Sequence, residues 1–440
     1  MNAALTLIEK TREALVEDDF LRGDPVTGDR YYSTEFMRQE WEHMWTRTWQ
    51  VGAVEAQFPA SGCVVTHEIG KESILMVRDD DGRIRAFYNV CQHRGNRMVE
   101  CEETRVKRLV CNYHSWCYGL NGRLLIAKDS ANDFPQGNPV GKLGLKEVRC
   151  EVFAGLVWIN MDPHARPLRD SLGVVADQLE RYQMDRMVRV MHMTAEVECN
   201  WKVIQDNFNE SYHVSALHKE LATFIDDDYQ NTDFEIYRNG HTRMLMKGCL
   251  PSPTARQGEV QEPLASIMRH WQLNPEDYQG RPDEARLAVQ QQKRKLGEER
   301  GFSHFANLTD EQLTDYHHYT LFPNMSFTMA ADSFQILRPQ LHPTDPEKCL
   351  FDHWFFVRAE NGQTEAETPV GVRPVAPAEH EVFKHGEKSI GFVADQDLSV
   401  AVAQQRGLNS RGYSDSYLAG QEARVRRYHE VINDYIAGRR

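Results

Sequence analysis

Apolar positions in the first part of the chain recur at the spacing of an amphipathic helix. In the segment EFMRQEWEHMWTRTWQ, the large apolar side chains form one stripe of a helical surface. Residues 1–45 are therefore predicted to be helical. The members of the stripe are Phe36, Trp41, Met44, Trp45 and Trp49.

Shorter apolar runs separated by turn residues follow, and they predict strands. SILMVR and RIRAFYNV flank DDDG, in which Gly82 suits a backbone position with positive φ. A second turn, Asn121-Gly122, lies between SWCYGL and RLLIA, and GLVWIN at residues 155–160 is typical of a buried strand. This part of the chain is predicted to be antiparallel β-sheet.

From about residue 165 helical periodicity returns. PLRDSLGVVADQLERYQ is predicted to be an amphipathic helix with Asp170 as its N-cap, and further helices are expected at residues 397–408 and 420–437. The sequence thus predicts an α+β protein with three parts. These are an N-terminal helical segment (1–45), a β domain (46–162) and a larger C-terminal domain (163–440).

Composition narrows the class of protein. The 440 residues carry a net charge of −14, which disfavours a nucleic-acid partner because phosphates repel such a surface. No secretory signal and no apolar run long enough to span a bilayer are present, and most of the nine cysteines stand alone. A cytoplasmic protein with reduced thiols is predicted.

The stretch CQHRGNRMVECEETRVKRLVCNYHSW holds two mixed pairs of metal ligands, Cys91 with His93 and Cys111 with His114. A zinc finger usually keeps its two cysteines in one pair and its two histidines in the other. Mixed pairs instead suit a cluster in which one iron takes both thiolates and the other takes both imidazoles, as in a Rieske [2Fe–2S] centre. Tyr113, Ser115 and Trp116 are expected to donate hydrogen bonds to sulfur or to shield it from water.

A second cluster of ligands lies in NWKVIQDNFNESYHVSALHKE, residues 200–220. Asn207, Glu210 and His213 are spaced to lie along one helical stripe, and His218 can reach the same metal only if the helix ends or distorts. A distant carboxylate would complete the two-histidine, one-carboxylate set that holds Fe(II). Asp395 and Asp397 both qualify by position, and either could instead be an ordinary carboxylate at a helix N-terminus.

Together these features resemble the catalytic (α) subunit of Rieske non-haem iron oxygenases. The resemblance extends from about residue 30 to the C-terminus and includes RYYSTEFMRQEWEHMWTRTWQVGAV, the Rieske loops, the NWK–DNFNESYH–H block and the final DxDL…QQRG segment. It implies an antiparallel-β Rieske domain followed by a helix-grip domain, in which a curved antiparallel sheet surrounds a helix and holds a mononuclear iron.

The resemblance also assigns roles to residues. Cys91, His93, Cys111 and His114 would bind the cluster, and His213, His218 and Asp397 would bind Fe(II). Asp397 is preferred because it stands eight residues before Gln405. Glu210 would carry electrons between His213 and His114 of a neighbouring subunit. Most family members have aspartate there, and glutamate resembles a minority branch that acts on quaternary amines. Asn207 would lie near the iron.

The implied function is the terminal oxygenase of a multicomponent system that uses O₂ and electrons relayed from NAD(P)H. An aromatic or other hydrophobic substrate is the first expectation. The aromatic and methionine residues of segment 317–339 could line its pocket, and core packing explains such residues at least as often. N-dealkylation or C–H hydroxylation of a quaternary amine or an aliphatic compound is the alternative. A Rieske electron carrier without oxygen chemistry and a zinc-stabilised binding module are rival classes.

The implied partners follow from what the sequence lacks. No nucleotide-binding glycine motif and no plant-type ferredoxin spacing is present, so a separate flavin reductase, with or without a ferredoxin, would deliver the electrons. The resemblance implies a homotrimer, either alone or with a small β subunit.

Overall fold

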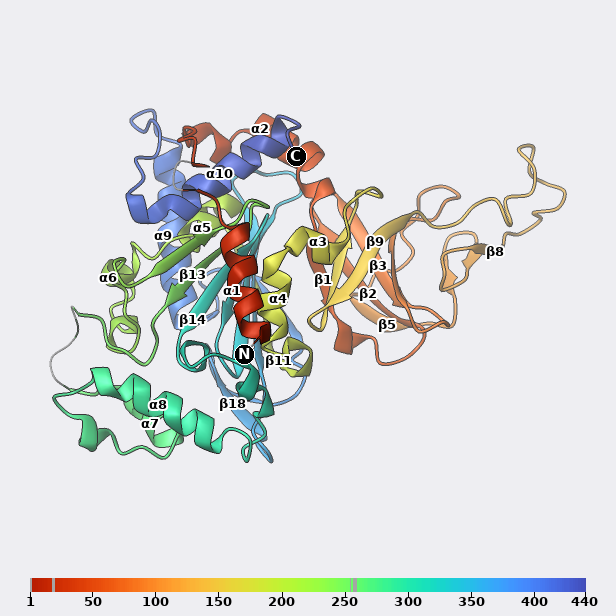
Figure 1. Cartoon of the computed structure of the whole chain (residues 1–440). Helices are drawn as coiled ribbons and strands as arrows, with labels where there is room; N and C mark the ends of the chain where they lie inside the picture. Colours follow the sequence, from red (N-terminus) through yellow and green to blue (C-terminus); the bar gives the residue numbers. More distant parts are fainter. Residues whose placement is uncertain (1, 18–19, 254, 256–258) are drawn as a thin grey trace. The chain divides into compact units, whose positions relative to one another are not determined.

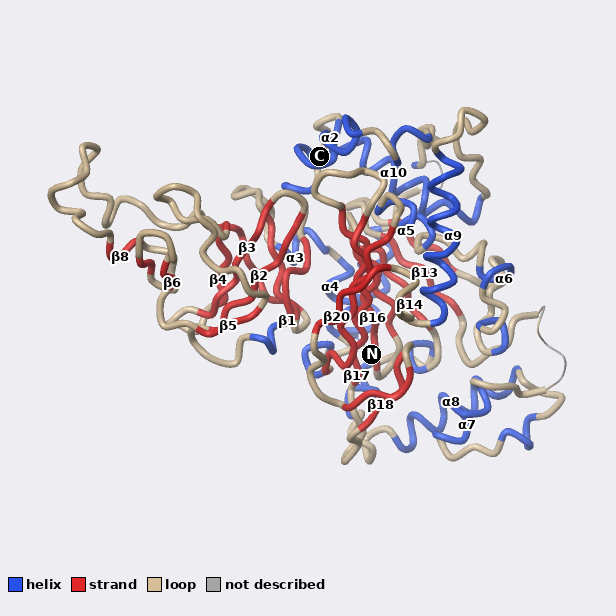
Figure 2. Tube along the Cα trace, turned by 180° about the vertical axis from the view of Figure 1, so that it is seen from behind, coloured by secondary structure: helices blue, strands red, loops and turns tan. Residues whose placement is uncertain are grey.

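The computed structural model describes residues 2–17, 20–253, 255 and 259–440. Contacts within it divide the chain into two compact units, which Figures 1 and 2 draw from opposite sides. The larger unit comprises Met1–Glu40 and Leu172–Arg440, and the smaller unit comprises Trp41–Ser171. The N-terminal segment up to Glu40 thus belongs to the larger unit.

The smaller unit is built from two antiparallel sheets. The first has the strand order β1-β10-β9-β4-β3-β2-β5, and the second has the order β6-β7-β8. The two turns predicted from the sequence are confirmed, since Gly82 and Gly122 have φ of 80° and 78° and lie between paired strands. The strands are β1 (Gln50–Val54), β2 (Cys63–Ile69), β3 (Glu72–Arg78), β4 (Ile84–Tyr88), β5 (Glu103–Arg105), β6 (Leu109–Val110), β7 (Cys117–Tyr118), β8 (Leu124–Ile126), β9 (Glu147–Phe153) and β10 (Leu156–Asn160).

The larger unit is organised by a sheet with the strand order β12-β13-β14-β15-β16-β17-β11-β20. All neighbours in it are antiparallel except β11 and β20, which run parallel. Its strands are β11 (Val188–Val197), β12 (Asp233–Ile236), β13 (Thr242–Met246), β14 (Tyr316–Leu321), β15 (Met325–Met329), β16 (Ser333–Leu341), β17 (Cys349–Val357) and β20 (His380–Lys384), with β18 (Glu365–Thr368) and β19 (Gly371–Pro374) pairing separately. The α+β class predicted from the sequence is confirmed.

Helices accompany this sheet on several sides, and two of them, α1 and α4, lie against each other (Figure 1). Lys10 of α1 pairs with Asp177 of α4 at 2.7 Å. The helices are α1 (Asn2–Ala14), α2 (Thr34–His43), α3 (Leu168–Leu172), α4 (Val174–Glu180), α5 (Trp201–Asn207), α6 (Val214–Leu217), α7 (Leu264–His270), α8 (Asp283–Leu296), α9 (Phe392–Leu408) and α10 (Ala423–Ile436).

Two helix predictions need correction. Residues 1–45 do not form a continuous helix, because α1 ends at Ala14 and α2 begins at Thr34, and Trp49 lies just before the first residue of β1. The helix predicted over 167–183 is broken at Gly173, whose φ of 59° is left-handed and interrupts the helical backbone. Asp170 therefore lies inside α3 and is not an N-cap.

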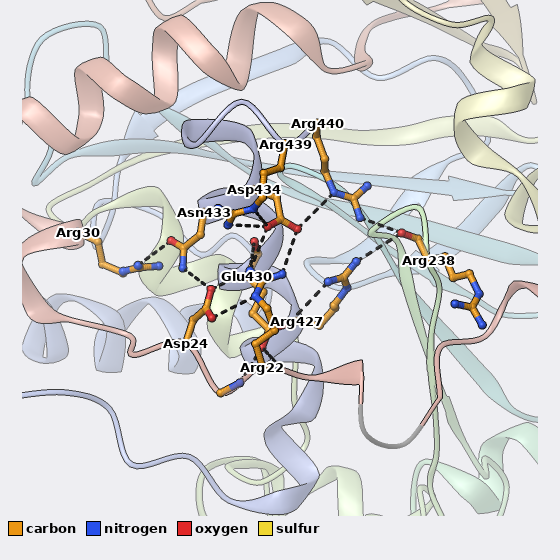
Figure 3. Close-up of polar contacts among 11 residues, drawn as sticks. Arg22, Asp24, Arg30, Arg238, Arg427, Glu430, Asn433, Asp434, Arg439 and Arg440 are labelled. Atoms are coloured by element: carbon orange, nitrogen blue, oxygen red, sulfur yellow. Dashed lines mark hydrogen bonds and ion pairs between the residues drawn. The ribbon is translucent and has the colours of Figure 1, made fainter.

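Helix α10 is fixed by both apolar and polar contacts. The apolar side chains of Val425, Tyr428 and Ile432 are buried. On another side of the helix, Glu430 accepts hydrogen bonds from the backbone N–H groups of Arg22 and Gly23. Figure 3 shows these contacts together with those of Asp434 and its neighbouring arginines. The N-terminal segment is thereby tied to the last helix.

Among the described residues, no helix combines the length and the apolar composition that crossing a bilayer requires.

Candidate metal centres

The two loops that carry the cysteine–histidine pairs share one backbone design. In the first, the N–H of Gly95 donates to the carbonyl of Cys91, and in the second the N–H of Ser115 donates to the carbonyl of Cys111, both at 3.0 Å. Gly95 and Ser115 each adopt a left-handed φ, of 76° and 58°. Glycine adopts this conformation readily, whereas serine rarely does. Each loop presents a cysteine and a histidine on one tight turn.

The histidines of these loops face each other. The ring centroids of His93 and His114 are 4.6 Å apart, and His93 stacks on Trp116 at 4.7 Å. Nδ1 of His93 is buried without a hydrogen-bond partner. A buried, unpartnered imidazole nitrogen beside two buried cysteines is the donor set that a thiolate–imidazole cluster needs. The residues therefore fit a Rieske cluster.

The surroundings of the loops differ in part from the sequence prediction. Trp116 is buried and stacks on His93, whereas Tyr113 is exposed and its ring lies tilted against that of His114. The hydroxyl of Tyr118 lies 3.3 Å from Sγ of Cys91. Because the N–H of Gln92 already donates to this hydroxyl, the Tyr118 hydrogen is directed to Cys91. Nothing in the spacing had singled out Tyr118.

The second set of ligands lies where a helix ends. Asn200 caps α5 by accepting a hydrogen bond from the N–H of Lys202, and the helix stops at Asn207. Asn207, Glu210 and His213 therefore do not share one helical stripe, and that prediction is wrong. The accompanying condition for His213 and His218 to meet, that the helix ends or distorts between them, is fulfilled, since α6 ends at Leu217 and His218 has a non-helical φ of −114°.

His213, His218 and Asp397 converge on one point. One ligand atom from each lies within 4.8 Å of the others. Oδ1 of Asp397 is 2.8 Å from Nε2 of His218 and 3.6 Å from Nε2 of His213. The two rings are nearly perpendicular, at 81°. This is the geometry of a two-histidine, one-carboxylate metal site with room left on one side.

Both histidines are oriented by acceptors on their other nitrogens. Nδ1 of His213 lies 2.5 Å from Oε1 of Glu210, and Nδ1 of His218 lies 2.7 Å from Oε1 of Gln396. Each Nδ1 must then carry the proton, which leaves both Nε2 atoms free to bind a cation. Burial lowers the pKa of His218, but the hydrogen bond and charge of Asp397 outweigh it and raise the pKa. The carboxylate of Asp397 thus places a negative charge beside the two free Nε2 atoms, and the residues fit a ferrous ion.

Asp395, the other candidate carboxylate, has a different position. Its oxygens accept hydrogen bonds from the hydroxyl of Ser389 and the N–H of Ile390 at the start of α9. Asp395 is therefore a local partner of the helix N-terminus, while Asp397, two residues later, is buried beside both histidines.

Next to these ligands lies a cavity of about 340 Å³. Four side chains from successive strands form a row across its floor: Met244, His318, Thr328 and Gln335 are paired in register. Asn207 also lines the cavity, and its Nδ2 is buried without a partner. The remaining wall is mostly aliphatic and aromatic, including Phe208, Leu221, Phe224, Ile225, Met246, Tyr316, Leu337 and Phe392.

In segment 317–339, core packing and not pocket lining accounts for the aromatic and methionine side chains. Its aromatic and methionine side chains, such as Met325, Phe327 and Phe334, are buried in the core and do not line the cavity. Its lining residues are mainly polar, because side chains alternate between the two faces of a strand. The cavity's aromatic rings come from other elements.

Comparison with known protein families identifies both units. Residues 184–438 match the ring hydroxylating alpha subunit (catalytic domain) family, and residues 48–136 match the Rieske [2Fe-2S] domain. Since the first match covers more than half of the chain, the protein belongs to the family of Rieske-type oxygenase α subunits. It is an oxidoreductase, the terminal oxygenase component of such a system, with a Rieske cluster and a mononuclear iron as its cofactors.

Individual relatives fall into two groups. The chain is 35% identical over 198 residues to the glycine betaine monooxygenase oxygenase subunit of Chromohalobacter salexigens, covering 45% of this chain and 42% of that protein. It is 34% identical over 196 residues to the large oxygenase component of a 2,4-dinitrotoluene dioxygenase system from a Burkholderia species, covering 43% and 44%. The matching segments thus span less than half of either relative.

Among solved structures, a quaternary ammonium Rieske monooxygenase in complex with L-carnitine shares the fold. Its TM-score is 0.65 at 19% identity, covering 96% of this chain and 99% of that one.

Proposed function

We propose that this oxygenase is a monooxygenase of amines, and that its substrate carries a quaternary or protonated nitrogen but no carboxylate. In the reaction one oxygen atom of O₂ enters a C–H bond next to nitrogen. The other leaves as water after two electrons and two protons are taken up. If the carbon is an N-methyl group, the hydroxymethyl product then loses formaldehyde and leaves the dealkylated amine.

The observation that carries this proposal is the charge of the cavity wall. Among the lining residues that the structure describes, the ionisable acids are Glu210 and Asp397, and there is neither lysine nor arginine. A buried carboxylate on the substrate would find no lysine or arginine to pair with, and such a group is costly to desolvate unpaired. Aromatic faces such as Phe208 and Phe224, in contrast, attract an alkylammonium group.

Two further features support an amine. By the family resemblance, Glu210 stands where aspartate is more usual, and glycine betaine and carnitine are named in the descriptions of related oxygenase subunits. Those two compounds bear a carboxylate, so the proposed substrate differs from them at that end.

The chain's own residues have distinct tasks in this proposal. His213, His218 and Asp397 would hold the ferrous ion, which supplies the O₂-dependent oxidation of the C–H bond. Glu210 would keep Nδ1 of His213 hydrogen-bonded and would link it to His114 of a neighbouring copy in a trimer. Electrons would come from a separate flavin reductase, directly or through a ferredoxin.

The test is substrate-dependent oxygen uptake with a surrogate reductase. Choline and glycine betaine both present a trimethylammonium group, and only glycine betaine has a carboxylate. We expect choline to be turned over with a kcat/KM at least about tenfold higher, corresponding to about 1.4 kcal/mol. A preference for glycine betaine would contradict the argument from wall charge.

A second candidate function is hydroxylation of an aromatic compound. The aliphatic and aromatic majority of the cavity wall favours it, as does the similarity to a dinitrotoluene dioxygenase component. Turnover of indole or naphthalene, with no uptake of oxygen on choline, would replace the amine proposal by this one.

A further inference from the structure

One polar group of the cavity, the amide of Gln335, has no role in the site described so far. Gln335 lies on β16 at the end of the cross-strand row and is only half-buried. One end of its amide lies 2.8 Å from Nε2 of His353 on β17, where the structure places Oε1. Within the described part of the chain, nothing hydrogen bonds to the other end of the amide.

Whether Oε1 or the NH₂ group of Gln335 lies next to His353 depends on the protonation of His353. Nδ1 of His353 lies 2.7 Å from the carbonyl oxygen of Ile390. A carbonyl only accepts, so Nδ1 carries a hydrogen. His353 is 2% exposed, and burial lowers its pKa to about 4. The nearby carboxylate of Asp395 is already bonded to Ser389 and Ile390. His353 is therefore neutral, and its Nε2 offers a lone pair.

Two acceptors would then face each other at 2.8 Å if Oε1 of Gln335 pointed to His353. Rotating the amide by a half-turn about its last bond leaves its shape unchanged and replaces Oε1 by the NH₂ group. The NH₂ group then donates to Nε2 of His353, and the contact becomes a hydrogen bond. Oε1 is left at the end of the amide that no residue of the wall satisfies.

We propose that Gln335 is a specificity-determining residue that presents its carbonyl oxygen to the cavity as a fixed acceptor. The substrate it selects carries a hydroxyl or N–H donor on the part that meets β16. His353 is a positioning residue, because it holds the amide in this orientation through Ile390. The inference rests on the proposed function only in that the cavity binds the substrate, since a donor can be part of an amine or of an aromatic compound.

The test uses two pairs of probes, each differing by one methyl group on the donor. Choline and its O-methyl ether serve if amines are turned over, and indole and 1-methylindole serve if aromatic compounds are. In the wild type we expect kcat/KM to be about fivefold higher for the donor-bearing member, which is the effect of one neutral hydrogen bond. If only the indole pair is turned over, the amine proposal is wrong, and the comparison of indole with 1-methylindole still tests the role of Gln335.

Variants separate hydrogen bonding from size. Gln335→Met keeps the length of the side chain and removes the acceptor, so the preference should vanish, mainly through KM. His353→Phe should weaken the preference by freeing the amide. Gln230→Met, an exposed substitution outside the cavity, is the matched control and should leave the preference intact. Persistence of the wild-type preference in Gln335→Met, or a wild-type preference for the methylated probes, would overturn the inference.

A measurement on the wild type guards against variants that fail to fold. Neutron diffraction from crystals of the whole chain locates the hydrogens on His353 and Gln335. We expect hydrogen on Nδ1 of His353, none on Nε2, and the Gln335 NH₂ group toward His353. Hydrogen on both nitrogens of His353 would overturn the proposal, because the NH₂ group would then face the cavity.

Discussion

Each histidine of the proposed iron site depends on one acceptor, and the two acceptors differ in charge. Glu210 holds His213 with a carboxylate, and Gln396 holds His218 with a neutral amide. Partners of this kind orient a ligand ring and raise its affinity for metal. Their loss should therefore affect iron binding and turnover differently from loss of a ligand.

Replacing Gln396 by alanine tests the second of these contacts. Without the acceptor, the ring of His218 is no longer fixed with Nε2 toward Asp397. We expect the affinity for Fe(II) to fall by about 10- to 100-fold. Competition with a chelator measures this affinity without reference to turnover. An unchanged affinity would show that Asp397 alone orients His218.

Glu210 uses both of its oxygens. Oε1 meets Nδ1 of His213, and Oε2 accepts the backbone N–H groups of Tyr212 and His213. With Fe(II) supplied in excess, Glu210→Ala should keep both metals bound and nearly abolish turnover. Glu210→Gln should also be impaired, because an amide has one acceptor where two are needed, whereas Glu210→Asp should recover part of the activity. Iron content and single-turnover kinetics check this, and full activity of Glu210→Ala would refute the bridging role.

At the residue scale, the sequence predicts those metal ligands that lie close together along the chain. The mixed cysteine–histidine pairs and the pair His213 and His218 stand out in short segments. Asp397 could not be separated from Asp395 by physics alone, because the choice depends on which side of α9 faces the histidines. Gln396, Gln335 and Tyr118 were missed, since each acts through a partner distant in sequence.

At the scale of elements, α5 is anchored by an ion pair with no access to water. Nζ of Lys202 lies 2.8 Å from Oε1 of Glu40 on α2, and the two side chains are 0% and 1% exposed. Burial lowers the pKa of Lys202 and raises that of Glu40, and each charge opposes the effect on the other. The aromatic rings of Phe36 and Trp201 surround the ammonium group.

Breaking this pair should destabilise the larger unit. Lys202→Met leaves Glu40 buried without a partner and should lower the free energy of unfolding by about 3–5 kcal/mol. The double variant Lys202→Met with Glu40→Leu should restore most of it, because no uncompensated charge remains. Denaturant unfolding of the wild type, the single variant and the double variant measures these differences in free energy. Equal losses in the single and double variants would mean that packing, not charge, matters here.

The errors of element prediction have a common cause. Periodicity shows which residues can share a face, but it does not show where a helix ends. Gly173 and the end of α5 at Asn207 interrupt patterns that continue in the sequence. The strands and turns of the smaller unit were predicted more closely, because Gly82 and Gly122 mark the turns directly.

At the scale of the molecule, stability should depend on pH through buried histidines. Burial lowers the pKa of His317 to about 3 and that of His353 to about 4. Both are neutral in the folded protein at pH 7, and in the unfolded chain they take up protons below about pH 6.5. Stability is therefore full above that pH and is lost as the pH falls.

As the pH falls from about 6.5 to its folded pKa, each such histidine should lower the free energy of unfolding by about 1.4 kcal/mol per pH unit. Denaturant unfolding at pH 7.5, 6 and 5 measures the slope, and His317→Asn should flatten it by one histidine's share. A wild-type stability that stays constant over this range would contradict the neutral, buried state.

The proposed chemistry requires two metal centres in one chain, and the iron content of the purified protein measures whether both are present. Purified wild-type protein should hold about three irons per chain, two in the cluster and one at the histidines. Asp397→Ala should hold about two and keep the visible spectrum of the cluster, while the matched control Asp395→Ala should keep all of them. Undiminished iron in Asp397→Ala, or zinc in place of the cluster iron, would contradict the account.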